Sequence, residues 1–232
     1  MKDQPAYLLS LYFIVAILHL VFIYLSNEYG IYATKPMLMA ILAWWFYLKT
    51  KASKKLPLKY FLSGIIFSMF GDILLMFKGE DFFLFGLVSF LIAHIFYIIW
   101  FVKYPGFKDG AIAQKPIKSI PFLLYLIAIV STLWGNLGDM KMPVIVYSAV
   151  ITFMAICAAN MKNRVNPEAF IPVVGGAILF VISDSIIAIS KFNSTDFPEN
   201  VNRTMIMSSY IAGQYLLAIG SYKAIGCGSN LM

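Results

Sequence analysis

The amino-acid sequence predicts an all-α, polytopic membrane protein with eight transmembrane helices. Of its 232 residues, 61% are hydrophobic and only 12% are charged, which is too little charged surface for a water-soluble domain of this size. The apolar residues form continuous stretches of about 18–22 residues, the length that a helix needs to cross the hydrocarbon core of a bilayer. Apolar and polar residues do not alternate within these stretches, and this argues against a transmembrane β-barrel.

Eight expected spans follow one another along the chain, and the polar breaks between them are too short to separate two domains. The first stretch is too long, and too weakly basic at its start, for an ordinary cleaved signal peptide, so we expect it to be a span. Several prolines lie near predicted span starts, where a missing N–H is harmless: Pro36, Pro57, Pro143 and Pro172. The predicted spans are residues 6–26, 31–49, 57–77, 82–102, 117–135, 141–160, 170–190 and 203–223.

Lysines and arginines concentrate in alternate loops. The second, fourth and sixth loops, with the two terminal segments, hold 13 of the 18 basic residues. Because cytoplasmic loops carry an excess of Lys and Arg, we expect both termini in the cytoplasm, and we favour a bacterial inner membrane. The basic residues flank apolar segments, so the net charge of +7 indicates solvated loops beside a membrane and no nucleic-acid partner.

A weak internal repeat relates two halves of the chain, about 1–104 and 105–232, within a single membrane domain expected over residues 1–232. Residues 64–72 (GIIFSMFGD) in the third span align with residues 176–184 (GAILFVISD) in the seventh. Equivalent spans lie four apart, so both halves run in the same direction. This predicts a pseudo-symmetric 4+4 arrangement about an axis normal to the membrane.

Each aligned segment ends in an aspartate inside a predicted span, Asp72 and Asp184. A carboxylate inside the bilayer costs several kcal/mol unless it is paired, hydrated or protonated, so such residues usually have a function. Both lie at similar depth, and they meet if their spans face each other. Two carboxyl groups that share a site cannot easily both ionise, so one can be an acid while the other is a base.

Three functions fit such a pair. Acid–base hydrolysis is one, and a proton relay in a proton-coupled small-molecule transporter is another. A lipid-binding or assembly module, in which hydrogen bonds between helices hold two structural aspartates, is the third.

Other polar residues are expected near the aspartates. Ser68 lies one turn before Asp72 on the same helix face. Lys35 opens the second span and could contact a phosphate, pair with a carboxylate or only anchor the span at the membrane surface. His19 and Asn160, nearer span ends, are expected to be structural.

Two further pairs share helix faces in the predicted spans. His94 and Tyr97 are three residues apart in the fourth span, and Tyr210 and Gln214 are four apart in the eighth. Each pair could serve the site or only pack between helices. The two histidines lie in separate spans and no HExxH motif is present, so no metal site is expected. The sequence also lacks a Gly-rich phosphate loop and a GxSxG motif.

Five segments together resemble the YhhN family of membrane proteins, whose animal members are lysoplasmalogenases. They occur in order from the second span to the eighth: residues 34–39 (TKPMLM), 67–76 (FSMFGDILLM), 85–97 (FGLVSFLIAHIFY), 176–185 (GAILFVISDS) and 210–214 (YIAGQ). Each segment alone is weak, whereas the combination is specific and covers nearly the whole chain.

The resemblance implies hydrolysis of the vinyl ether bond of a lysoplasmalogen, or of a related lysolipid, to a fatty aldehyde and a glycerophospho-headgroup. Asp72 and Asp184 would be the acid and the base, and Lys35 would contact the substrate phosphate. The orienting or proton-sharing groups would be His94, Tyr97, Tyr210 and Gln214. The expected partners are the lysophospholipid substrate and membrane lipids, and no metal or organic cofactor is required.

Overall fold

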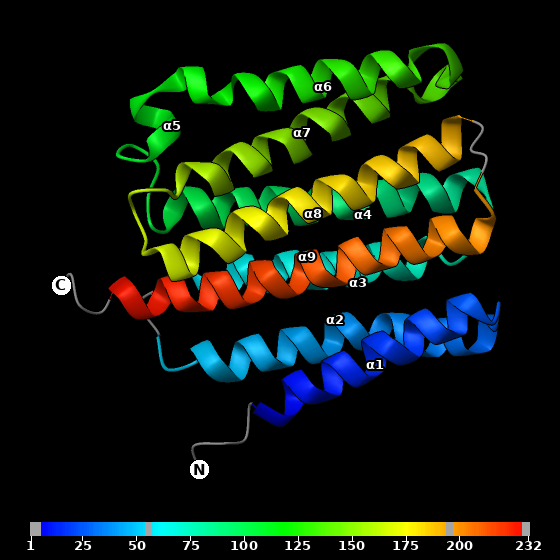
Figure 1. Ribbon diagram of the computed structural model, residues 1–232, viewed down its shortest axis with the longest axis horizontal. Helices are drawn as coiled ribbons and strands as arrows, with labels where there is room; N and C mark the ends of the chain where they lie inside the picture. The colour runs from blue at the N-terminus through cyan, green and yellow to red at the C-terminus, as the bar shows by residue number, and fades with distance from the viewer. Residues whose placement is uncertain (1–5, 54–56, 194–196, 229–232) are drawn as a thin grey trace. The chain divides into compact units, whose positions relative to one another are not determined.

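The computed structural model describes residues 6–53, 57–193 and 197–228, and the described residues form helices and no strand (Figure 1). Each predicted span overlaps a helix or a run of helices. Residues 54–56 and 194–196, in two predicted polar breaks, lie outside the described residues. The helices are α1 (Ala6–Tyr24), α2 (Glu28–Thr50), α3 (Leu58–Leu74), α4 (Glu80–Lys103), α5 (Ala111–Gln114), η1 (Pro116–Ser119), α6 (Ile120–Leu133), η2 (Trp134–Asn136), η3 (Gly138–Met140), α7 (Lys141–Asn160), α8 (Pro167–Phe192) and α9 (Glu199–Gly228).

Six helical segments of the described chain are long and apolar enough to cross a membrane, and the protein is an integral membrane protein. They are α1, α2, α4, residues 116–136, residues 138–160, and α8. The other two predicted spans correspond to α3, which has 17 residues, and to α9, which begins with the polar sequence ENVNRT. The count of eight transmembrane helices therefore stays a prediction.

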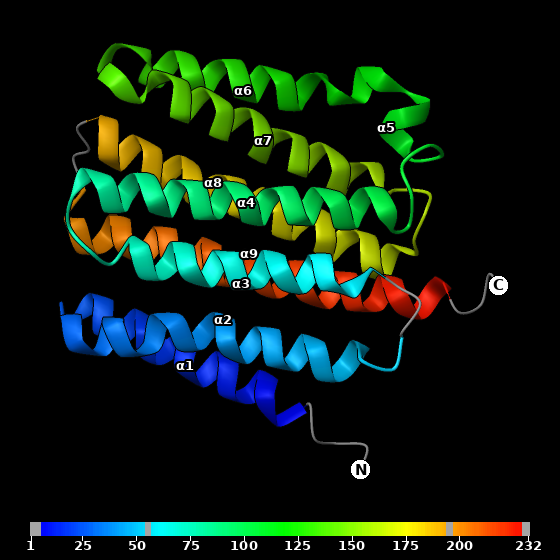
Figure 2. The ribbon, with the colours of Figure 1, turned by 180° about the vertical axis from the view of Figure 1, so that it is seen from behind.

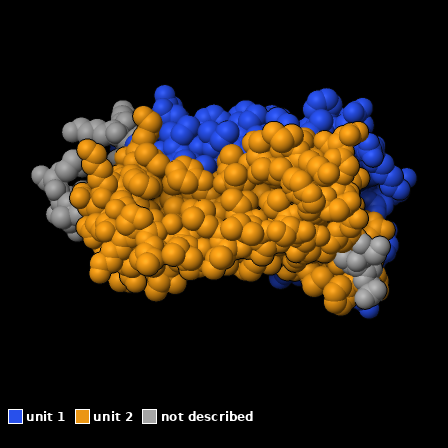
Figure 3. All heavy atoms as spheres, turned by 90° about the horizontal axis from the view of Figure 1, so that it is seen from above, with its two compact units in different colours: residues 1–100 blue, residues 101–232 orange. Residues whose placement is uncertain are grey.

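The chain divides into two compact units, residues 1–100 and residues 101–232, shown in blue and orange in Figure 3. The division falls within α4, close to the predicted boundary between the repeat halves. The repeat itself stays a prediction.

In the first unit, α2 and α3 are antiparallel neighbours (Figure 2). The rings of Phe46 and Phe61 lie 4.5 Å apart near one end of the pair. Toward the other end, the Tyr32 hydroxyl donates a hydrogen bond to the Met76 carbonyl at 3.4 Å. Residue numbers therefore rise along α2 as they fall along α3, and this register brings residue 35 opposite residue 72.

Helices α3 and α4 pack against each other because glycines of α3 receive large side chains of α4. A Cβ on Gly64 would lie 2.4 Å from the ring of Tyr97, and one on Gly71 would lie 2.6 Å from the ring of Phe90. These side chains occupy space that any residue other than glycine would fill. Close approach through small residues is typical of helix pairs in membranes.

His19 joins α1 to α2 in the same unit. Its Nδ1 lies 2.8 Å from the Thr34 hydroxyl oxygen, and Thr34 donates to the Gly30 carbonyl at 2.6 Å. Since the Thr34 proton goes to that carbonyl, His19 Nδ1 is the donor toward Thr34. Both side chains are buried, and the contact supports the structural role expected for His19.

In the second unit, α8 and α9 form an antiparallel hairpin and lie side by side (Figures 1 and 2). A Cβ on Gly176 would lie 2.7 Å from both the Gly213 carbonyl oxygen and the Leu217 amide nitrogen of α9. A Cβ on Gly220 would lie 2.7 Å from the backbone nitrogen of Val173. Here the two backbones themselves are in contact, so these positions tolerate no side chain without a shift of the helices.

Asn160, at the end of α7, organises the connection between α4 and α6. Its Oδ1 accepts hydrogen bonds from the backbone N–H groups of Ile112 and Ala113 at 2.9 and 2.8 Å, and its Nδ2 donates to the Phe107 carbonyl at 2.8 Å. Arg164 adds hydrogen bonds to the Pro105 carbonyl at 2.7 Å and to Asp109 at 2.9 Å. The expectation of a structural role for Asn160 agrees with these contacts.

Replacing Asn160 by alanine is expected to lower the free energy of unfolding by about 2–4 kcal/mol. The side chain is 1% exposed, and its loss leaves two N–H groups and one carbonyl of a partly buried segment without their partner. Thermal unfolding of the detergent-purified protein measures the effect. Asn136→Ala, which removes one exposed side-chain hydrogen bond, is the control and should change little. Equal midpoints for the two variants would contradict the prediction.

Two of the proline placements were wrong. Pro36 and Pro172 lie inside α2 and α8, because these helices begin at Glu28 and Pro167, earlier than predicted. The starts of both are set by asparagine caps: Asn27 accepts from the N–H of Gly30 and Asn166 accepts from that of Ala169, each at 3.0 Å. Membrane helices tolerate such internal prolines because neighbouring groups compensate the lost hydrogen bond.

Candidate functional site

Asp72 and Lys35 form an ion pair between α3 and α2 in the first unit. The Lys35 Nζ lies 3.7 Å from Asp72 Oδ1, and the two side chains are only 13% and 4% exposed. Of the roles considered for Lys35 from sequence, pairing with a carboxylate is the one that this contact confirms. An ammonium group at this distance offsets part of the cost of shielding the carboxylate from water.

The position of Asp72 on its helix strengthens the need for a cation. Helix α3 ends at Leu74, earlier than the expected residue 77, so Asp72 lies two residues from the helix end. The C-terminal end of a helix carries partial negative charge from its free carbonyl groups, which disfavours a nearby carboxylate. The Lys35 ammonium offsets both this unfavourable term and the loss of hydration.

Ser68 lies one turn before Asp72, as predicted, and both side chains are buried. Within the described part of the chain the Ser68 hydroxyl has no hydrogen-bond partner. A buried hydroxyl next to an ion-paired carboxylate is a group that a substrate atom or a water molecule can satisfy.

His94 and Tyr97 are both fully buried on α4. The Tyr97 ring packs against Phe61, with centroids 5.1 Å apart, and against the backbone at Gly64. This surface of α4 therefore faces α3, the helix that carries Asp72. The predicted supporting role of the two residues stays a prediction.

In the second unit, Asp184 of α8 is half-buried and accepts a hydrogen bond on Oδ2 from the Tyr147 hydroxyl of α7. Tyr147 itself is 8% exposed. Sequence reasoning missed Tyr147, because one tyrosine among 14 carries no distinguishing local pattern. The signal was present in the spacing: Tyr147 precedes Asp184 by 37 residues, and Lys35 precedes Asp72 by the same separation.

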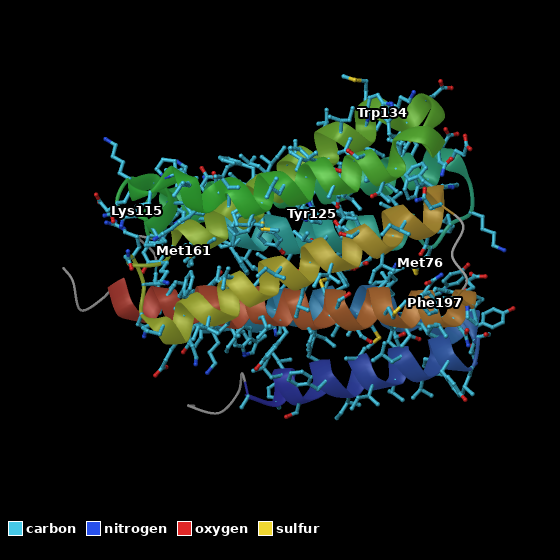
Figure 4. The ribbon with its side chains drawn as sticks, turned by 45° about the horizontal axis from the view of Figure 1, so that its top comes forward. Met76, Lys115, Tyr125, Trp134, Met161 and Phe197 are labelled. Atoms are coloured by element: carbon cyan, nitrogen blue, oxygen red, sulfur yellow. The ribbon has the colours of Figure 1, made fainter. Side chains whose placement is uncertain are left out.

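A second tyrosine lies in the same region of this unit. The hydroxyl groups of Tyr125 on α6 and Ser185 on α8 are 2.7 Å apart, and Ser185 donates to the Val181 carbonyl at 2.5 Å. Figure 4 labels Tyr125 partway along α6. The hydroxyl groups of Tyr125, Tyr147 and Ser185 thus all lie in the neighbourhood of Asp184 in this unit.

Tyr210 and Gln214 share a buried face of α9, as predicted. The Gln214 Nε2 donates to the Tyr210 hydroxyl oxygen at 3.4 Å, and the Tyr210 ring packs on Phe180 of α8 with centroids 5.4 Å apart. This places both residues on the surface of α9 that meets the helix carrying Asp184.

Each aspartate is therefore held by a polar side chain from the preceding long helix of its own unit, a lysine for Asp72 and a tyrosine for Asp184. Such groups can hold, give or accept a proton away from bulk water. The joint action of the two aspartates stays a prediction. Across the described ranges, no group of three or more His, Cys, Asp or Glu side chains is arranged to hold a metal ion.

Comparison with known proteins identifies relatives over most of the chain. The YhhN family model matches residues 30–221. A protein named lysoplasmalogenase TMEM86A from Bos taurus is 30% identical over 166 residues, and its counterpart from Homo sapiens is 27% identical over 164 residues. These alignments cover 69% of this chain, and the chain spans only 64% of the length of each relative. No solved structure matches the chain.

Proposed function

Because the chain belongs to the YhhN family, we propose that it is an intramembrane hydrolase that cleaves the vinyl ether bond of a lysoplasmalogen or a related lysolipid. The names of the bovine and human relatives support this substrate class. The observation that carries the proposal is the pair of aspartates in apolar helices, each held by a polar partner: Lys35 for Asp72 and Tyr147 for Asp184. Acid–base chemistry needs carboxyl groups kept in defined protonation states in this way.

The reaction requires one acid, one base and one water molecule. The acid protonates the β-carbon of the vinyl ether, and the double-bond electrons form the new C–H bond and leave an oxocarbenium ion. A carboxylate takes a proton from water, whose oxygen attacks the cationic carbon to give a hemiacetal. As the hemiacetal collapses, the carboxyl group that took a proton from water gives it to the glycerol oxygen, and the carboxylate left by the acid takes the hemiacetal hydroxyl proton. This restores both groups and releases a fatty aldehyde and a glycerophospho-headgroup. Asp72 and Asp184 supply the acid and the carboxylate, and the carboxylate also stabilises the cation.

The supporting residues act on the substrate or on the aspartates. Ser68 is buried one turn from Asp72 and is a candidate to position the attacking water. His94 and Tyr97 in one unit, and Tyr210 and Gln214 in the other, orient the substrate or share protons with it. The burial of their side chains supports these assignments, since buried polar groups in a membrane protein are costly unless they are used.

We propose eight transmembrane helices in two pseudo-symmetric sets of four, with both termini in the cytoplasm of a bacterium and the protein in its inner membrane. The alternating distribution of lysines and arginines supports this orientation. The lysolipid substrate is amphipathic, so an intramembrane site lets its alkyl chain stay in an apolar environment.

The experiment that tests the function is aldehyde release from a defined lysoplasmalogen by detergent-purified protein. Release of one aldehyde for each glycerophospho-headgroup is the expected result. A folded protein that releases neither from lysoplasmalogens nor from other lysolipids would contradict the proposal. Uptake of a solute into liposomes driven by a pH gradient, without cleavage, would instead identify a proton-coupled transporter.

Replacing Lys35 by methionine is expected to lower kcat by at least about 10-fold, because Asp72 loses its ammonium partner in a shielded site. Lys35→Arg keeps the positive charge and should retain much more activity. Steady-state kinetics with both variants distinguish the pairing of Lys35 with Asp72 from a contact of Lys35 with the substrate phosphate. A rise in KM with unchanged kcat would show that Lys35 contacts the substrate phosphate and does not control Asp72.

A further inference from the structure

Tyr147 has no role in the proposed reaction as described so far, yet its hydroxyl contacts one of the two aspartates. We propose that Tyr147 is the positioning residue for Asp184 and that Asp184 is the carboxyl group that protonates the vinyl ether; this inference rests on the proposed hydrolase function. The contact of α7 with α8 places the two side chains together.

The hydrogen bond from Tyr147 divides the two oxygens of Asp184 into different roles. The phenol O–H donates to Oδ2, so Oδ2 is an acceptor in both protonation states. The proton that Asp184 transfers is then carried on Oδ1. Because Tyr147 belongs to helix α7 and is only 8% exposed, it holds the carboxyl plane in one orientation while the proton leaves.

The neighbouring hydroxyl groups support Tyr147 as the donor to Asp184. Ser185 donates its proton to the Val181 carbonyl, so the Tyr125 hydroxyl is the donor in its 2.7 Å contact with Ser185. The Tyr125 proton is thereby used away from Asp184. This leaves the Tyr147 O–H directed at Asp184 Oδ2.

The two units place different partners at equivalent positions. Lys35 precedes Asp72 by 37 residues, and Tyr147 precedes Asp184 by the same number. Tyr147 therefore follows Lys35 by 112 residues, which is also the offset between the aligned segments 64–72 and 176–184. An ammonium ion favours an ionised carboxyl group more strongly than a neutral phenol does. The substitution of tyrosine for lysine at this position therefore suits Asp72 as the carboxylate and Asp184 as the proton donor.

The Tyr147 hydrogen bond lowers the barrier because it strengthens during the reaction. While Asp184 is a neutral acid, the phenol donates to an uncharged carbonyl oxygen. As the proton moves to the substrate carbon, negative charge develops on the carboxyl group and the same hydrogen bond becomes charge-assisted. An interaction that is stronger in the transition state than in the ground state raises kcat with little effect on KM.

The test compares Tyr147→Phe with the wild type in the aldehyde-release assay. We expect kcat to fall about 10- to 100-fold and KM to change by less than about threefold. Tyr24→Phe removes a hydroxyl group from a residue that is 74% exposed, and it is the matched control that keeps wild-type kinetics. Thermal unfolding confirms that Tyr147→Phe is folded. Replacing Tyr147 by fluorinated tyrosines of graded acidity gives a second readout, because kcat should follow the acidity of the phenol only if its proton is shared with Asp184.

A measurement that needs no turnover separates this inference from the proposed function. The infrared carboxyl bands of Asp184, identified by their loss in Asp184→Asn, should shift in Tyr147→Phe and stay unchanged in Tyr24→Phe. If the wild type releases no aldehyde but the bands shift, the hydrolase proposal fails and the positioning of Asp184 by Tyr147 stands. Wild-type kcat in Tyr147→Phe, or unshifted bands, would overturn the inference even if the protein is a hydrolase.

Discussion

Asp72→Asn and Asp184→Asn are each expected to reduce aldehyde release about 10³-fold or more, with the protein still folded. Asparagine keeps the size of the side chain but can neither release a proton as an acid nor accept one as a carboxylate. In Asp72→Asn the Lys35 ammonium also loses its charged partner, so this variant should be the less stable of the two. Initial rates with a defined lysoplasmalogen, together with thermal unfolding of each variant, provide the measurement.

Each unit offers a matched control for these substitutions. Asp81→Asn in the first unit and Asp139→Asn in the second make the same chemical change at exposed positions, and both should retain wild-type rates. Near-normal rates for either Asp72→Asn or Asp184→Asn would show that the two aspartates do not act together. Wild-type behaviour of both in every assay would make them structural residues.

Gly176→Ala is expected to destabilise the protein by about 3 kcal/mol or more, although it adds a single methyl group. That group would lie 2.7 Å from backbone atoms of Gly213 and Leu217, so α8 and α9 would have to move apart. Thermal unfolding in detergent, with the yield of folded protein, measures the effect.

The adjacent glycine provides the control. A Cβ on Gly175 would meet its nearest neighbour, a methyl group of Leu216, at 3.8 Å, which is an ordinary contact. Gly175→Ala should therefore be neutral or slightly stabilising, since alanine is favoured over glycine inside a helix by about 1 kcal/mol. The two substitutions thus have opposite expected signs at neighbouring positions. Equal unfolding midpoints would be incompatible with the close backbone contact of α8 and α9.

The long helices could be placed from sequence because bilayer thickness sets their length and composition. Their ends were less predictable: α2 and α8 begin before the expected residues because Asn27 and Asn166 cap them, and internal prolines then follow. Helix α5 was missed entirely. It has four residues and depends on tertiary contacts with Asn160, which no local pattern reveals.

The candidate site was predictable only in part. A charged residue in an apolar stretch is conspicuous, so Asp72, Asp184 and Lys35 stand out in the sequence. Tyrosine is common both at membrane surfaces and between helices, so Tyr147 and Tyr125 do not stand out in the sequence. Only the packing of α6 and α7 on α8 shows which tyrosines contact Asp184 and Ser185.

The Asn160 contacts have a consequence for biosynthesis. Ribosomes make residues 105–114 well before Asn160 and Arg164, whose side chains hold this connection in the finished protein. In the nascent chain, the amide groups of Ile112 and Ala113 must therefore stay hydrated until α7 has been inserted. The connection cannot reach its final structure as its own segment leaves the translocon, and its closure shows that α7 has reached its place.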